Sequence, residues 1–231
     1  MLDHWLDLVH GAGCVGCPKP GRSLCAQCAS RLPARGLSVR PTPCPDGLAA
    51  CFAGGEYADL LRAMILRHKE HGTFALAAPL GRVLAAAATC ALDPAGVAVL
   101  VPIPSRAAVV RARGHDPVLR FTRVAARHLR SNRHRVRVGQ VLAQQGPVHD
   151  QAGLSAGQRA ANLVGSMGVR ASGRAALARS EDPLSLLLCD DVLTTGATAR
   201  EAQRALEESG LRIRAVVTVA ATRKQLPPRA G

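Results

Sequence analysis

The amino-acid sequence predicts an α/β domain with a parallel sheet covered by helices on both faces, preceded by a small cysteine-rich unit. Three strand candidates are apolar along their whole length and are separated by segments of helical periodicity, which is typical of parallel sheets buried on both sides. The chain has 231 residues, enough for one substantial domain and a small appendage, and five of its eight cysteines fall within the first 50 residues. We therefore expect residues 1–48 to form an N-terminal helix, a metal-binding ribbon and a linker, and residues 49–231 to form the main domain.

The N-terminal unit is too short and too polar to bury a large hydrophobic core. Apolar residues recur at helical spacing over Leu2–Val9, which predicts a short amphipathic helix. Proline and glycine dominate Arg40–Gly47, which predicts a linker.

Helical periodicity then predicts four helices in the main domain. The first carries leucine, methionine and isoleucine on one face, the second is rich in alanine and leucine, the third has a basic outer face, and the fourth ends before Gly210, where a C-terminal glycine belongs. These helices are expected over Tyr57–His68, Phe74–Leu92, Pro117–Arg130 and Ala197–Ser209.

Four segments are predicted to be strands. Val97–Ile103 is a continuous apolar run, and Leu184–Cys189 and Ile213–Ala220 are expected to be two further buried strands. The fourth, Arg135–Leu142, alternates valine with polar residues. The last residues, Arg223–Gly231, are expected to be a frayed tail.

The net charge of the chain indicates which classes of ligand or macromolecule it could bind. The chain has 30 lysine and arginine residues against 16 aspartate and glutamate residues, a formal net charge of +14, which favours nucleic acid or phosphate-rich small ligands. Only three basic residues are lysines, so the arginine- and alanine-rich coding of a GC-rich genome is an equally good explanation of the excess. No apolar run is long enough to span a bilayer, and Met1–His10 has no basic leader, so we expect a cytoplasmic protein with no membrane insertion and with reduced cysteines.

The most informative segment runs from Leu186 to Arg200, with the sequence LLLCDDVLTTGATAR. Its buried strand delivers Asp190 and Asp191 to the carboxyl end of the sheet, where open α/β sheets bind ligands. The helix that follows begins in a threonine-rich turn, Thr194–Thr198, and the unpaired N–H groups of a helix N-terminus suit an anion. The arrangement fits a ligand with a diol at one end and a phosphate at the other, such as a ribose 5-phosphate. The alternative is a strand and a capped helix with solvated carboxylates.

The same segment resembles the phosphoribosyl pyrophosphate fingerprint of type I phosphoribosyltransferases, and it fits at every position from Leu186 to Thr198. The chain lacks the glycine-rich pattern of a Rossmann dinucleotide site and the Gly-Lys-Ser/Thr of a P-loop. Other stretches in the same order, together with the cysteine-rich N-terminus, resemble the ComF family of phosphoribosyltransferase-like proteins, some of which serve DNA uptake in competent bacteria. These stretches are Tyr57, Lys69–Gly72, Val101–Ser105, Arg111–Asp116, Asp150–Ser155 and Arg159–Leu163.

The resemblance implies a type I phosphoribosyltransferase-like fold and a role for each matching residue. Asp190 and Asp191 would be the catalytic acidic pair and hold the ribose 2′- and 3′-hydroxyls, while the threonine-rich turn would wrap the 5-phosphate. The loop after the first apolar strand would receive the pyrophosphate, with Arg106, Arg111 or Arg113 as counter-charge, although any one of these arginines fits a solvated helix face as well. The residues implicated in substrate binding are Asp190, Asp191, Thr194, Thr195, Gly196, Ala197, Thr198, Ile103, Pro104, Ser105, Arg113, Arg159 and Lys69.

Two of these residues have equally good ordinary explanations. Arg159 would lie on a loop, Gln151–Asn162, that closes over the substrate, and the alternative is a surface helix. Lys69, one of only three lysines, would reach a phosphate, and the alternative is a plain surface position.

In this family type, pyrophosphate is displaced at the anomeric carbon through an oxocarbenium-like transition state, with Mg²⁺ bound by the diphosphate and the ribose hydroxyls. Catalysis then depends on positioning and charge neutralisation rather than on a protein nucleophile. Purine-salvage members carry an aspartate general base where this chain has Thr194. A threonine hydroxyl cannot act as a base near neutral pH, which argues against 6-oxopurine salvage and leaves the acceptor open.

Two C-x-x-C pairs, Cys14/Cys17 and Cys25/Cys28, are separated by seven residues. In a protein whose cysteines stay reduced, this spacing predicts a four-thiolate structural zinc site that stabilises a segment with little core, and disulfides or free thiols are the lesser alternatives. ComF-type proteins similarly carry an N-terminal zinc ribbon. The spacing of Cys44 and Cys51 makes a poor knuckle, so we expect them not to bind metal.

Two functions follow as competing hypotheses. The first is a phosphoribosyltransferase that uses Mg²⁺ and an unknown acceptor. The second is a non-catalytic accessory module of transformation or recombination, which binds single-stranded DNA or other DNA-uptake proteins. The high positive charge favours the second, whereas an aromatic content of 2% argues against a base-stacking surface.

Overall fold

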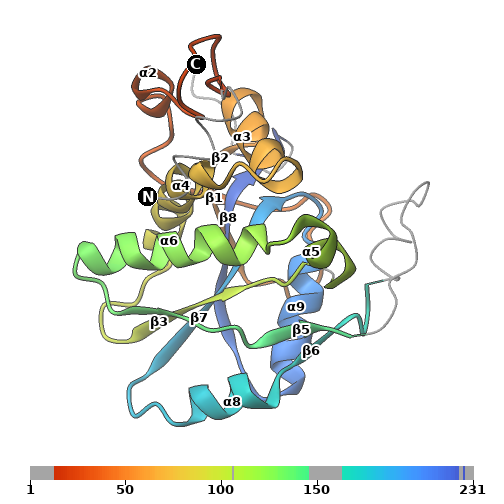
Figure 1. Ribbon diagram of the computed structural model, residues 1–231. Coiled ribbons are helices and arrows are strands. Elements are labelled where there is room, and N and C mark those ends of the chain that lie inside the picture. The colour runs from red at the N-terminus through yellow and green to blue at the C-terminus, as the bar shows by residue number, and fades with distance from the viewer. Residues whose placement is uncertain (1–12, 106, 146–162, 224–225, 227–231) are drawn as a thin grey trace.

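The computed structural model describes residues 13–105, 107–145, 163–223 and 226. Its centre is a six-stranded sheet in which every neighbouring pair is parallel except β1 and β2 (Figure 1). The strand order is β1-β2-β8-β7-β3-β4. The strands are β1 (Leu37–Val39), β2 (Ala50–Glu56), β3 (Val97–Pro102), β4 (Val136–Val138), β7 (Leu184–Leu193) and β8 (Ile213–Ala221).

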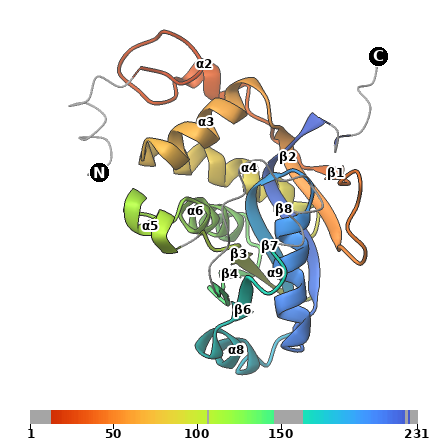
Figure 2. The same cartoon turned by 90° about the vertical axis from the view of Figure 1, so that its right-hand side faces the viewer.

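Helices cover both faces of this sheet, as the sequence predicts (Figure 2). Side chains alternate along β3, so that Ala98 and Leu100 pack with α3, α4 and α6, whereas Val99 and Val101 pack with α9. The helices are α2 (Ala26–Ala29), α3 (Asp59–Glu70), α4 (Ala77–Thr89), α5 (Ala107–Arg113), α6 (Pro117–Ser131), α8 (Ala171–Ala178) and α9 (Ala197–Glu208), with a 3₁₀ turn η1 (Phe74–Leu76) before α4. None of the helices in the described part of the chain is long and apolar enough to cross a membrane.

The core consists mainly of leucine, valine and alanine side chains, with few aromatics. Helices α4 and α6 approach closely at Gly81, where a Cβ atom would lie 2.5 Å from Cβ of Val124 and 2.8 Å from the carbonyl oxygen of Phe121. The alanine-rich face of α4 thus lets α6 lie close to it over the sheet, and the helix predicted over Phe74–Leu92 is confirmed from Ala77 after one 3₁₀ turn.

The three continuous apolar strands are confirmed, and β7 runs four residues further than predicted, through Asp190 and Asp191 to Leu193. The single strand predicted over Arg135–Leu142 is wrong. The segment divides into β4 and β5 (Leu142–Gln144), and β5 pairs with β6 (Met167–Val169) in a separate two-stranded sheet. The break lies at Gly139, where a Cβ atom would lie 2.8 Å from Cγ1 of Val99.

The N-terminal residues are tied to the main sheet. Strand β1 pairs antiparallel with β2, so the predicted boundary after residue 48 falls between two paired strands. The segment Arg40–Gly47 runs along α9, where Arg200 Nε donates to the carbonyl oxygen of Asp46 at 2.9 Å and Gln203 Nε2 donates to that of Gly47 at 2.7 Å. The helix predicted over Leu2–Val9 and most of the predicted C-terminal tail lie outside the described residues.

Candidate functional site

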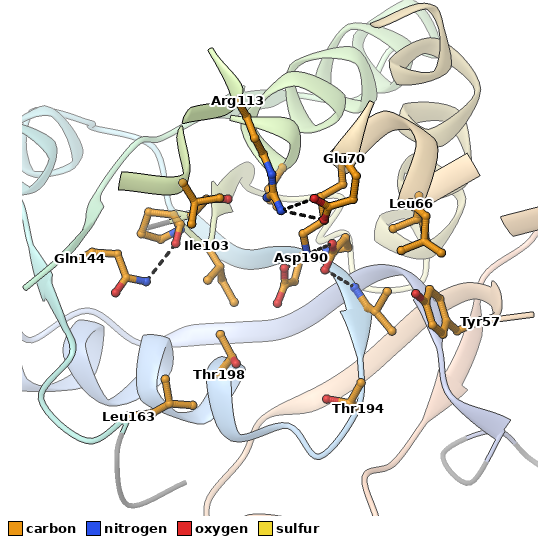
Figure 3. A pocket seen from close by; sticks show the side chains of 18 of the residues that line it. Tyr57, Leu66, Glu70, Ile103, Arg113, Gln144, Leu163, Asp190, Thr194 and Thr198 are labelled. Atoms are coloured by element: carbon orange, nitrogen blue, oxygen red, sulfur yellow. Dashed lines mark hydrogen bonds and ion pairs between the residues drawn. The ribbon is translucent and has the colours of Figure 1, made fainter. Parts of the chain in front are cut away.

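A pocket of about 520 Å³ opens at the carboxyl ends of β3 and β7 (Figure 3). Its walls come from α3, α5, β5, β6 and the turn before α9, so segments far apart in the sequence meet there. Nine of the predicted substrate-binding residues line it: Lys69, Ile103, Pro104, Ser105, Arg113, Asp190, Asp191, Thr194 and Thr198.

The acidic pair forms one side of the pocket. Because side chains alternate along β7, Asp191 shares the sheet face of Leu187 and Cys189, which is the face that α3 covers. Asp191 is 8% exposed, and its Oδ2 lies 2.7 Å from Nζ of Lys69 at the end of α3. Its Oδ1 accepts a hydrogen bond from the N–H of Val192 at 2.8 Å. The carboxylate is therefore held at both oxygens, one by its own strand and the other by α3.

Asp190, the other member of the pair, has a perturbed pKa. Burial raises its pKa well above the ordinary value, and the neighbouring charge of Asp191 raises it further, although the charge of Lys69 opposes both. Asp190 Oδ1 accepts from the N–H of Asp191 at 2.8 Å. A hydrogen bond from a ligand hydroxyl, or a bound cation, would stabilise the ionised form of this carboxyl group, which burial disfavours.

Lys69 is held by this pair. Burial alone lowers the pKa of its ammonium group, but the charge of Asp191, the hydrogen bond to it and the charge of Asp190 outweigh burial and raise the pKa above the ordinary value. Lys69 therefore stays protonated at neutral pH. The structure places it in the pocket rather than at a plain surface position.

The threonine-rich turn forms the opposite side. Thr194 and Thr198 face the pocket, whereas Thr195, Gly196 and Ala197 are not among its lining residues. Thr195 Oγ1 accepts from the N–H of Ala197 at 3.4 Å. The N-cap residue of α9, Gly196, has no side chain, and of the first N–H groups of this 12-residue helix only that of Ala197 has a side-chain partner in the described part of the chain, so the next ones are available to an anion.

Gly196 is also needed for packing behind the turn. Its φ of 76° is left-handed, and a Cβ atom would lie 2.9 Å from Cγ of Pro41 and 3.0 Å from Cδ2 of Leu48. The absence of a side chain at Gly196 thus lets the segment before β2 pack closely against the turn.

A second pair of opposite charges faces the pocket. Arg113, from α5, and Glu70, the last residue of α3, point toward one another in Figure 3. Arg113 Nη2 donates to both carboxylate oxygens of Glu70, at 2.7 and 2.8 Å. Of the other predicted cations, Arg111 does not line the pocket, and Arg106 and Arg159 lie outside the described residues, as does the loop Gln151–Asn162.

The remaining wall is mostly apolar and was missed by the sequence analysis. Gln144 on β5 donates from Nε2 to the carbonyl oxygen of Pro104 at 3.0 Å and so joins the small sheet to the end of β3. Leu163 and Met167 complete this wall. Three-residue strands carry too little periodicity to be recognised in a sequence. Glu70 could have been singled out because it follows Lys69 at the end of a helix, but the sequence does not show that it pairs with Arg113.

The four cysteines of the two C-x-x-C pairs form a second site. Their sulfur atoms all lie within 4.8 Å of one another, and Cys17 Sγ is 3.7 Å from Cys25 Sγ. Four thiolates on a tetrahedral zinc ion stand about 3.8 Å apart, given Zn–S bonds of about 2.3 Å. The cluster is therefore compatible with structural zinc binding.

The electrostatics of the cluster agree with this chemistry. Burial raises the pKa of Cys14, but hydrogen bonds from the backbone N–H groups of Cys25 and Gly16 lower it to about 6. Burial and the surrounding cysteines raise the pKa of Cys28 to about 12. A divalent cation stabilises the thiolate form, so metal binding at this cluster would displace the proton of Cys28. The cluster packs against Leu60 of α3, the helix whose other end lines the pocket.

Cys44 and Cys51 stand apart from this cluster. Their thiols donate to the carbonyl oxygens of Pro45 and Ala49, at 3.6 and 3.3 Å. Burial, together with the charge of Cys44, raises the pKa of Cys51 to about 12, as expected for an unreactive core thiol.

Comparison with models of known protein families and with curated proteins found no match to this chain.

Proposed function

We propose that this chain binds phosphoribosyl pyrophosphate with Mg²⁺ and is a phosphoribosyltransferase-like protein of the ComF type. The observation that carries the proposal is that one pocket gathers an acidic pair, a threonine-lined helix N-terminus and two cations. In Figure 3, Asp190 lies between the Arg113–Glu70 pair on one side and Thr194 and Thr198 on the other. A ribose carrying phosphate groups at both ends has the same order of chemical groups.

The pocket suits such a ligand in size as well as in polarity. Its volume of about 520 Å³ falls within the range usual for small-molecule sites. The 5-phosphate would meet the Thr194–Thr198 turn and the N–H groups that begin α9. The ribose hydroxyls would donate to Asp190 and Asp191, which supplies the hydrogen bonds that the ionised form of Asp190 needs. The diphosphate would lie at Ile103–Ser105, within reach of Arg113.

The chemistry that these residues support is transfer of the phosphoribosyl group by displacement of pyrophosphate. Asp190 and Asp191 orient the ribose and stabilise the positive charge that develops at its ring, while Arg113 and Lys69 stabilise the leaving diphosphate. The oxygen atoms of the acidic pair are the hard donors that Mg²⁺ prefers, and the ion would neutralise charge on the diphosphate. Thr194 cannot serve as a general base, so the acceptor must be a nucleophile that needs no deprotonation by this residue.

We propose in addition that the cluster of Cys14, Cys17, Cys25 and Cys28 holds one structural zinc ion. Zinc would order the segment 14–29, in which the structure has the four-residue helix α2 and no other helix or strand. Because the cluster contacts Leu60, zinc would also stabilise the position of α3, which carries Lys69 to the pocket.

The enzyme proposal is tested by measuring pyrophosphate release from phosphoribosyl pyrophosphate and Mg²⁺ in the presence of a panel of nucleobases, amines and phosphorylated acceptors. Acceptor-dependent release identifies the reaction. Binding of phosphoribosyl pyrophosphate without release by any acceptor would instead indicate a protein that senses the ligand.

A second candidate function, binding of nucleic acid as an accessory module in DNA uptake, is favoured by one observation. Arg120, Arg123 and Arg127 line a groove of about 630 Å³ on α6, and none of them forms a salt bridge with a described acidic residue. They span about 10 Å along the helix. The guanidinium of Arg120 lies over the ring of Phe74, 3.9 Å from its centroid, so this ring face is not open for a base to stack on. The arginines would therefore contact the phosphates of a nucleic acid rather than its bases.

This second candidate is tested by titrating a single-stranded oligonucleotide at increasing salt. Three neutralised phosphates predict a slope of log K against log salt of about −2, and replacing the three arginines with glutamine should remove it. A flat salt response would exclude binding driven by phosphates.

A further inference from the structure

Each cation in the described lining of the pocket is already paired with a carboxylate from within it. Lys69 pairs with Asp191, and Arg113 pairs with Glu70. The described lining therefore carries two cations against three carboxylates, since Asp190 also faces the pocket. An anionic ligand must enter a site that is not positively charged, although the whole chain carries a net charge of +14.

The two ion pairs differ in how firmly they are held. Asp191 is 12% exposed in its side chain and is fixed at both oxygens, whereas the side chain of Glu70 is 46% exposed. Glu70 is the last residue of α3, so its side chain is free to turn into solvent without disturbing the helix. The Arg113–Glu70 pair is therefore the one that a ligand can open.

The geometry of this pair leaves Arg113 ready for a second anion. Both hydrogen bonds to Glu70 come from Nη2, and in the described part of the chain no bond is formed by Nε or Nη1 of Arg113. The arginine side chain is 21% exposed and already lies in the pocket. A diphosphate can thus approach the free edge of the guanidinium and then displace the carboxylate from the other edge.

We propose that Glu70 is an internal competitor for the diphosphate: it occupies Arg113 in the empty pocket, and ligand binding exchanges the carboxylate for a phosphate oxygen. This inference rests on the proposed function of the pocket. Glu70 holds Arg113 in an orientation facing the ligand, but the same charge opposes ligand binding. The residue sets how tightly the pocket binds diphosphate, which limits binding to ligands with enough charge to displace it.

The effect of removing the competitor follows from the ion pair that the ligand must open. An ion pair in which one partner is nearly half exposed favours the closed state by up to about fivefold, and salt reduces this contribution. We expect Glu70→Gln to tighten binding of a diphosphate ligand by about twofold to fivefold at low salt.

The test compares four proteins by calorimetry: wild type, Glu70→Gln, Arg113→Met and the double variant. Asp182→Asn serves as the matched control, because Asp182 forms an exposed ion pair with Arg135 and does not line the pocket. Each protein is titrated with phosphoribosyl pyrophosphate and, separately, with inorganic pyrophosphate, both with Mg²⁺. Thermal unfolding of each variant checks that it is folded.

The proposal predicts that Glu70→Gln tightens binding in the presence of Arg113 and has no larger effect than Asp182→Asn when Arg113 is methionine. Unchanged or weaker binding by Glu70→Gln overturns it, as does equal tightening with and without Arg113, which would indicate a general charge effect. The two ligands separate this inference from the proposed function. Pyrophosphate needs Arg113 but not the ribose-binding acidic pair, so it reports on Glu70 even if phosphoribosyl pyrophosphate does not bind.

Discussion

Replacing Lys69 with methionine tests the electrostatic arrangement of the pocket most stringently. The substitution keeps much of the side-chain volume but removes the charge 2.7 Å from Asp191. Exposed ion pairs contribute about 0–1 kcal/mol and loss of one partner of a fully buried pair costs about 3–5 kcal/mol, so a pair of intermediate exposure predicts a loss of about 1–2 kcal/mol in the free energy of unfolding.

The loss should depend on pH in a definite direction. The pKa of Asp190 in the folded protein is raised above 3.8, so ionising this carboxyl group costs free energy of folding. The protein is therefore free of this cost at low pH and loses stability as the pH rises through the folded-state pKa of Asp190. Removing Lys69 raises that pKa further. The pKa of Lys69 itself lies above 10.5, so its charge does not change between pH 4 and pH 8. Lys69→Met should therefore destabilise the protein more at pH 8 than at pH 4.5.

The assay is urea denaturation of wild type, Lys69→Met, Asp191→Asn and the double variant at both pH values. In the Asp191→Asn background the effect of Lys69→Met should shrink, because most of the interaction has already been removed. Equal destabilisation at pH 4.5 and pH 8, or an undiminished effect in the Asp191→Asn background, would refute the electrostatic reasoning.

Two further predictions concern the turn and the cysteine cluster. Gly196→Ala should lower the free energy of unfolding by about 2 kcal/mol in thermal unfolding, because residue 196 has a left-handed φ and the added Cβ atom would clash with Pro41. Gly210→Ala should cost less, because Gly210 has a similar φ but open space around it. Equal losses in the two variants would mean that the contact with Pro41 is unimportant. The purified protein should hold one zinc ion by elemental analysis and lose it in Cys14→Ser but not in Cys90→Ser, since Cys90 is exposed and outside the cluster; unchanged zinc in Cys14→Ser would contradict the assignment.

The parts of the fold that could be predicted are those whose signal is local. The strands β3, β7 and β8 are apolar at nearly every position because both faces of the sheet are buried, and this pattern is visible without knowledge of their neighbours. The acidic pair lies near the end of β7 and the threonine-rich turn follows that strand directly, so their shared location in one pocket was foreseeable.

The parts that could not be predicted depend on contacts between distant segments. The pairing of β5 with β6 joins residues more than twenty positions apart through strands of three residues, and nothing in either segment specifies its partner. The ion pair between Glu70 and Arg113 likewise joins α3 to α5 across the pocket. The steric role of Gly196 depends on Pro41, which lies in the predicted linker Arg40–Gly47, and on Leu48, which follows that linker.

The central claim is that the pocket at the ends of β3 and β7 binds phosphoribosyl pyrophosphate. Calorimetric titration of wild-type protein and of the Asp190→Asn/Asp191→Asn variant with this ligand and Mg²⁺ tests it most directly. We expect saturable binding by the wild type and none by the variant, whose thermal unfolding should remain cooperative. Absence of binding by the wild type, or undiminished binding by the folded variant, would contradict the claim.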